Sequence, residues 1–258
     1  MQDDLFGAPP AASNTPAPAP VKSPARQSLA RVNAAPPDEA LLAMARALPD
    51  QVRLGTSSWA YPGWAGLVWD TEYPESLLSR EGLRAYGEHP LLRSVSVDRS
   101  FYRPLTQDQY ARYAAQVPDD FRFVVKAPSH VTDVLVREAG ALWCLCLHAK
   151  MPRLADQLPL LRMLWPGPMV CRWNLNPLHG AYGYEDAQRE YEPYDRIHDI
   201  DHETRELLVR TIKGIAGAGQ NVLVTISNKA EGCAPLSVRA LAQGLAGAGP
   251  GPQRSATP

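Results

Sequence analysis

Six short apolar segments recur along the middle of the chain, and helical patterns separate most of them. Apolar runs of about four to eight residues predict buried strands, and a helix between two strands lets them pair in parallel. The alternation therefore predicts an α/β fold in which helices cover a parallel sheet. The expected strands are Val52–Ser57, Arg93–Asp98, Phe121–Ala127, Ala141–His148, Met169–Asn174 and Asn221–Asn228.

Capping signals mark three helix starts between and after these strands. Thr106 and Gln109 have the spacing of a capping box, in which each side chain bonds the backbone N–H of the other residue. Asp201 precedes an amphipathic stretch, and Pro235 suits the first turn of a last helix. Helices are therefore predicted to begin close to these positions.

Several of the predicted strands are apolar on one face and polar on the other. Val95 and Val97, for example, alternate with Ser96 and Asp98. Successive strand side chains point to opposite faces, and a parallel sheet covered on both sides is apolar on both. A TIM-type (β/α) barrel explains the pattern, because its outer face meets helices and its polar residues enter the lumen. An open sheet with one solvated face is the alternative.

The two ends of the chain differ in composition from the middle. Residues 1–37 hold eight of the 25 prolines, and residues 246–258 are rich in Gly, Ala and Pro. Both ends are expected to be disordered tails, since they have little to bury. Residues 38–245 are long enough to bury the core of one domain.

Charge and cysteine content limit the expected partners and compartment. The 26 Lys and Arg residues nearly balance 27 Asp and Glu residues, so net charge does not support a nucleic-acid partner. No apolar run approaches the ~18 residues of a membrane span, and the acidic start at Met1 is not a secretory signal. Four cysteines within apolar runs suit a reducing compartment. We expect a cytoplasmic protein with no membrane partner.

Charged and polar side chains gather where the predicted strands end, which is where barrel enzymes place their catalytic groups. Asp98 is predicted to act as a general base or to orient a cation, and Lys126 and Arg172 to clamp an anionic group. Salt bridges that merely fix the barrel are the structural alternative. The side chains expected to bind a ligand are Trp59, Tyr61, Tyr102, His148, Asn174, Asn228 and Lys229.

No metal site or cofactor is predicted. Cys144 and Cys146 lie two residues apart in a predicted strand and are interpreted as buried small hydrophobes. The sequence has no His-Glu-x-x-His, Cys-x-x-Cys, Gly-x-Gly-x-x-Gly, Walker or Gly-x-Ser-x-Gly motif. The cofactor therefore stays unassigned.

Four segments in a fixed order resemble the YecE-like family, domain of unknown function 72. They are Gly55–Trp64, Asp98–Pro104, Val117–Pro128 and Ser227–Ala234. The resemblance implies a TIM-type (β/α)8 barrel and a site at its mouth, but no reaction. This sequence also departs from the family pattern: Asp98 replaces a carboxylate two residues earlier, and only Arg172 remains of an Arg-x-His-Gly segment.

The largest departure from the family is a gap. Only the 13 residues from Pro128 to Gly140 separate the third and fourth predicted strands, where the family has two further βα units. We expect six of the eight strands, with the Phe121 and Ala141 strands poorly paired or unpaired and part of one wall missing. A six-stranded variant that closes differently is the alternative.

The function predicted from these patterns is binding or turnover of a small polar, anionic or sugar-like ligand at the barrel mouth. A catalytically silent, degenerate barrel is the alternative. Metal-dependent nucleic-acid processing is a weaker alternative, because it rests on fold analogy alone.

Overall fold

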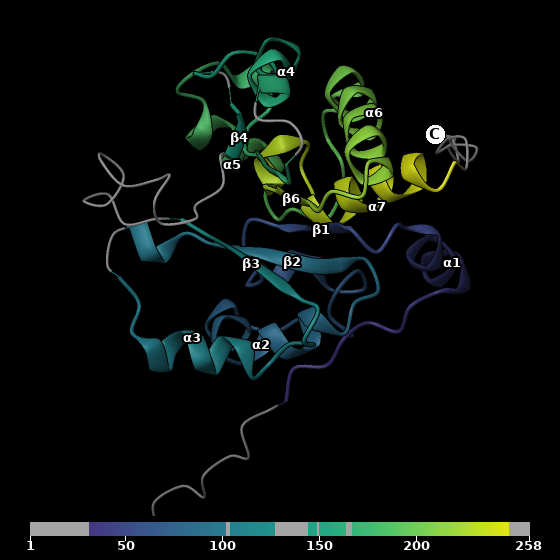
Figure 1. The fold of residues 1–258 in the computed structure, drawn as a ribbon. Coiled ribbons are helices and arrows are strands. Elements are labelled where there is room, and N and C mark those ends of the chain that lie inside the picture. Colours follow the sequence, from purple (N-terminus) through teal and green to yellow (C-terminus); the bar gives the residue numbers. More distant parts are fainter. Residues whose placement is uncertain (1–30, 102–103, 127–143, 149, 164–166, 248–258) are drawn as a thin grey trace, which may run out of the picture. The chain divides into compact units, whose positions relative to one another are not determined.

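The computed structural model describes residues 31–101, 104–126, 144–148, 150–163 and 167–247, and its main compact unit begins at Val32 (Figure 1). Val32 is fully buried, and the Ala35 N–H donates to the Val68 carbonyl at 2.9 Å. Arg84 also donates to the Val32 carbonyl at 3.0 Å, so both side-chain burial and hydrogen bonds attach this segment to the core.

The described residues form one six-stranded parallel sheet in the order β3-β2-β1-β6-β5-β4. Each strand lies within a segment that the apolar pattern predicted or begins one residue outside it, so all six predicted strands are confirmed. The bounds are β1 Val52–Thr56, β2 Leu92–Val97, β3 Arg122–Val125, β4 Cys144–Leu147, β5 Met169–Trp173 and β6 Val222–Ile226.

Helices lie between most of the strands, and α3 and α6 begin at the predicted side-chain caps. Thr106 and Gln109 form a complete capping box at the start of α3. The Asp201 carboxylate accepts the Thr204 N–H at 3.0 Å at the start of α6. The α-helices are α1 Glu39–Ala47, α2 Glu75–Gly87, α3 Gln107–Ala114, α4 Leu154–Met163, α5 Tyr184–Tyr191, α6 His202–Gly217 and α7 Ala234–Leu245. Among the described residues, no helix is both long enough and apolar enough to cross a membrane.

Hydrogen bonds across the sheet show that it is curled. Strand β1 lies between β2 and β6, yet the Ser96 and Thr225 hydroxyls of those outer two strands are 2.9 Å apart. Val95 and Val97 on the other face of β2 are buried in the apolar core. The polar side chains therefore point into a lumen, as the one-sided pattern predicted for a TIM-type barrel.

The curled sheet is an incomplete barrel. Strands β3 and β4 stand at the two ends of the strand order, and each pairs with one neighbour over four residues. No ladder joins β3 to β4 within the part of the chain that the structure describes. These two strands were expected to be poorly paired or unpaired. Each is paired along one edge, and neither is paired along its other edge within the described residues.

A buried histidine after α2 makes stability depend on pH. Burial lowers the pKa of His89 to about 4, and its ring nitrogen accepts the Leu91 N–H at 3.2 Å. In the unfolded chain the His89 imidazole becomes protonated as the pH falls below about 6.5. In the folded chain it becomes protonated only near pH 4. This histidine's contribution is complete above pH 6.5 and is lost as the pH falls toward 4.

The free energy of unfolding is therefore expected to fall between pH 6.5 and pH 4, with His89 contributing about 3 kcal/mol. Urea titrations at several pH values measure this fall. His89→Asn keeps an acceptor for Leu91 but does not titrate, so its stability should fall less steeply. An equal fall in the free energy of unfolding with pH for both proteins would contradict the assignment of this fall to His89.

Candidate functional site

An ion pair spans the lumen where the strands end. Asp98 follows β2, Arg172 belongs to β5, and their Oδ2 and guanidinium nitrogen are 2.5 Å apart. Two strands lie between β2 and β5 in the sheet, so only the curl brings these side chains together. The structure thus places two of the three predicted catalytic residues in contact.

The pair keeps two hydrogen-bonding atoms unused. Asp98 Oδ1 and Arg172 Nε are both buried, and neither has a hydrogen-bond partner among the described residues. An unpaired buried polar atom costs about 1–3 kcal/mol, so such atoms mark a place where a partner would stabilise the protein.

The two cysteines of β4 line the same face as this pair. The β4–β5 register sets Cys146 opposite Arg172, and the Asn174 amide lies 3.0 Å from Cys146 Sγ. Cys144 and Cys146 are both half-buried, which corrects their interpretation as buried hydrophobes. Apolar neighbours in the sequence suggested a core, but the register turns both thiols toward the lumen. Burial raises the pKa of Cys144 to about 11, so that thiol is protonated at neutral pH.

Aromatic side chains rim the pair. Tyr184 is the first residue of α5. Its ring centroid lies 5.1 Å from the ring centroid of His148 and 5.3 Å from Lys229 Nζ. Burial raises the pKa of Tyr184, and Cys146 contributes to that shift by its charge. Tyr184 carried no sequence signal beyond its place in a Gly- and Tyr-rich run.

Tyr61, a predicted ligand residue, packs among other aromatic side chains. Its ring centroid lies 5.0 Å from that of Trp64 and 5.4 Å from that of Tyr194. Burial raises the pKa of its phenol, with smaller contributions from the Glu75 and Asp98 carboxylates.

Three further predicted residues are Lys126, Trp59 and Tyr102. The Lys126 side chain is exposed, and its backbone carbonyl accepts the Ser100 hydroxyl at 2.7 Å. Trp59 packs against Tyr113, and its buried Nε1 has no partner among the described residues. Tyr102 lies outside the described residues.

Asn228 and Lys229 follow β6 and differ in their surroundings. The buried Asn228 Oδ1 accepts the Trp64 indole N–H at 3.2 Å and the Ala234 N–H at 2.9 Å. These bonds tie the loop after β1 to the start of α7, whereas the buried Asn228 Nδ2 has no hydrogen-bond partner among the described residues. Lys229 Nζ donates to Gln188 at 3.1 Å, and burial lowers its pKa.

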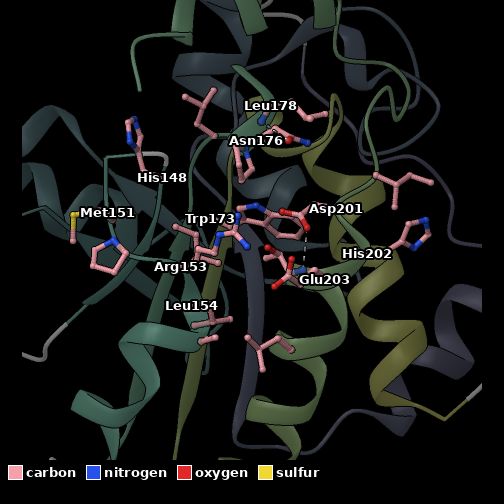
Figure 2. Close-up of a pocket in the computed structure, with 18 residues that line it drawn as sticks. His148, Met151, Arg153, Leu154, Trp173, Asn176, Leu178, Asp201, His202 and Glu203 are labelled. Atoms are coloured by element: carbon pink, nitrogen blue, oxygen red, sulfur yellow. Dashed lines mark hydrogen bonds between the residues drawn. The ribbon is translucent and has the colours of Figure 1, made fainter. Parts of the chain in front are cut away.

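A cavity of about 610 Å³, whose lining Figure 2 shows, contains neither Asp98 nor Arg172 in that lining. Its lining includes Trp173, which alternates with the lumen-facing Arg172 along β5 and so points to the opposite face. Leu154 of α4 and Leu207 of α6 also line it. Of the predicted site residues, His148 alone appears in this lining. The volume suits a small molecule, but the charged pair is not part of it.

Solved structures of two DUF72 family proteins resemble this chain. One from Enterococcus faecalis, solved at 3.10 Å, is 13% identical, with a TM-score of 0.44 and coverage of 75% of this chain and 95% of that chain. One from Thermotoga maritima, solved at 2.20 Å, is 18% identical, with a TM-score of 0.41 and coverage of 72% and 96%. No curated protein matches the sequence.

A family model described as "Protein of unknown function DUF72" matches residues 53–161. The match begins at β1 and contains the first three of the four motif segments that suggested the YecE-like resemblance, together with Cys144 and Cys146. Over residues 53–161, this chain is therefore similar to the DUF72 family.

Proposed function

We propose that the lumen mouth binds a small polyhydroxylated, sugar-like molecule through Asp98 and Arg172. The observation that carries the proposal is the pair of unused atoms, one acceptor at Asp98 Oδ1 and one donor at Arg172 Nε. A hydroxyl group both donates and accepts hydrogen bonds. Two neighbouring hydroxyls of one ligand therefore match both atoms.

The charges at the mouth favour a neutral ligand over an anion. Asp98 already neutralises Arg172, and an added anion would face the Asp98 carboxylate. This weighs against the anion clamp of Lys126 and Arg172 expected from the sequence. Tyr184 is 38% exposed and supplies a ring on which the apolar face of a sugar can pack, and Asn174 supplies an amide beside the pair.

Thermal shift and calorimetry measure the binding of neutral monosaccharides and polyols. Sugar phosphates serve as the anionic ligands for comparison. A ligand that binds only the folded protein at about 100 times its dissociation constant adds about 2.7 kcal/mol of stability. Asp98→Asn and Arg172→Gln are each expected to weaken binding about 10- to 100-fold, because each removes a hydrogen bond to a charged group.

The matched control is the exposed ion pair of Arg93 and Asp120, at the other end of β2. Arg93→Gln should bind as the unchanged protein does. No response to any neutral polyol, or a response that survives in both lumen variants, would overturn the proposal. A response only to the phosphates would favour the anion clamp instead.

A further inference from the structure

A second cluster of titratable side chains lies in the segment between β5 and α6. His179 ends the short 3-10 turn Pro177–His179, Glu190 belongs to α5, and Asp199 follows that helix. One potential metal-ligand atom from each of these residues lies within 4.8 Å of the others. We propose that this cluster binds a divalent transition metal of the Zn²⁺ class.

The hydrogen bonds of Tyr191 define which atoms remain available. The buried Tyr191 hydroxyl donates to Asp199 Oδ2 at 2.7 Å and lies 2.7 Å from His179 Nε2. A phenol has one proton, which goes to the carboxylate, so Nε2 must be the donor to Tyr191. This arrangement leaves the lone pair of neutral His179 on Nδ1.

The His179 Nδ1 atom faces the Glu190 carboxylate, and a cation between them would bind both. Glu190 Oε2 lies 4.0 Å from His179 Nδ1. A lone pair facing an anion is unfavourable unless a proton or a metal ion lies between them. Zinc ligands lie about 2.0–2.2 Å from the ion, which puts tetrahedral ligand atoms about 3.4 Å apart. The cluster therefore needs only a small contraction to coordinate an ion.

The surroundings of the cluster match those of a metal site. A ligating histidine usually donates its second N–H to an oxygen, which His179 does through Tyr191. The Asn176 amide donates to the Asp199 carbonyl at 3.2 Å and helps to fix that residue. Glu190 is exposed and gives the ion access from solvent.

A neighbouring imidazole atom also lacks a partner. The His198 ring centroid lies 5.1 Å from that of Tyr191, and its buried Nε2 has no hydrogen-bond partner among the described residues. A metal ion with three protein ligands carries water in its open position. Such water supplies the kind of partner that His198 Nε2 lacks. One imidazole with two carboxylates favours a borderline ion over Ca²⁺ or Mg²⁺.

The test measures zinc per chain by equilibrium dialysis of the purified full chain after chelator treatment. We expect one Zn²⁺ per chain, with binding weakened at least 10-fold by His179→Gln, Asp199→Asn or Glu190→Gln. Glu190 is exposed, so its variant carries little risk to folding. Tyr191→Phe removes only the orienting hydroxyl and should weaken binding about 10- to 100-fold.

Two controls separate this site from other zinc ligands. Glu185→Gln changes an exposed carboxylate on the same helix α5 and should leave binding unchanged. A double Cys144→Ser, Cys146→Ser variant should also keep its zinc, and the Co²⁺-loaded protein should show no thiolate-to-metal charge transfer. No zinc uptake, or uptake lost only in the cysteine variant, would overturn the proposal.

Discussion

Replacing Glu231 by alanine is expected to lower the free energy of unfolding by about 3–5 kcal/mol. Glu231 is fully buried, and its carboxylate accepts hydrogen bonds from Arg205 at 2.7 Å, Ser237 at 2.6 Å and the Asp201 N–H at 2.9 Å. Alanine leaves the Arg205 guanidinium, which is 20% exposed, without its counter-charge and removes the partner of two other donors. Urea unfolding of the two proteins measures the loss.

The reason for the loss can be tested separately from its size. A double variant with Arg205→Met and Glu231→Leu removes both charges, and it should lose less stability than Glu231→Ala alone. Arg189→Ala breaks an exposed ion pair with Asp186 and should cost no more than about 1 kcal/mol. A loss below about 1 kcal/mol for Glu231→Ala would show that Arg205 finds another partner.

The fold was predictable because its signals are local and periodic. Alternation of apolar and polar residues placed Ser96 and Asp98 in the lumen, where Ser96 meets Thr225 and Asp98 meets Arg172. The capping box at Thr106 also formed as predicted. Successive side chains of a strand point to opposite faces of the sheet. The polar face of a strand can therefore be identified from the sequence alone.

The surroundings of the ion pair and the second cluster were less predictable. The first depend on the β4–β5 register, and the second lies in a segment whose sequence shows no periodic pattern. Only the β4–β5 register shows that Cys146 faces Arg172 rather than the core. Twenty residues separate His179 from Asp199, and no motif spacing connects them. Asn228 was predicted to bind a ligand, but its bonds to Trp64 and Ala234 appear only in three dimensions.

Replacing Gly55 by alanine is expected to cost about 3 kcal/mol or more and to reduce the yield of soluble protein sharply. A Cβ atom at Gly55 would lie 1.8 Å from the backbone oxygen of Ser94 and 2.5 Å from its carbonyl carbon. The register between β1 and β2 shifts between Leu54 and Gly55, so the two backbones meet closely at this point. A carbonyl of a central strand cannot move away without breaking the ladder on both of its sides.

Gly214 provides the matched control for this substitution. An added Cβ there meets nothing within 4 Å, and the residue lies inside α6, where alanine is favoured over glycine by about 0.5–1 kcal/mol. Gly214→Ala should therefore raise the urea midpoint while Gly55→Ala lowers it. Equal stability of the two variants would mean that β1 and β2 can separate without loss. A lower stability of Gly55→Ala than of Gly214→Ala would explain why the Gly55–Trp64 motif begins with glycine. The close packing of β1 against β2 requires a glycine there, independently of any ligand at the lumen mouth.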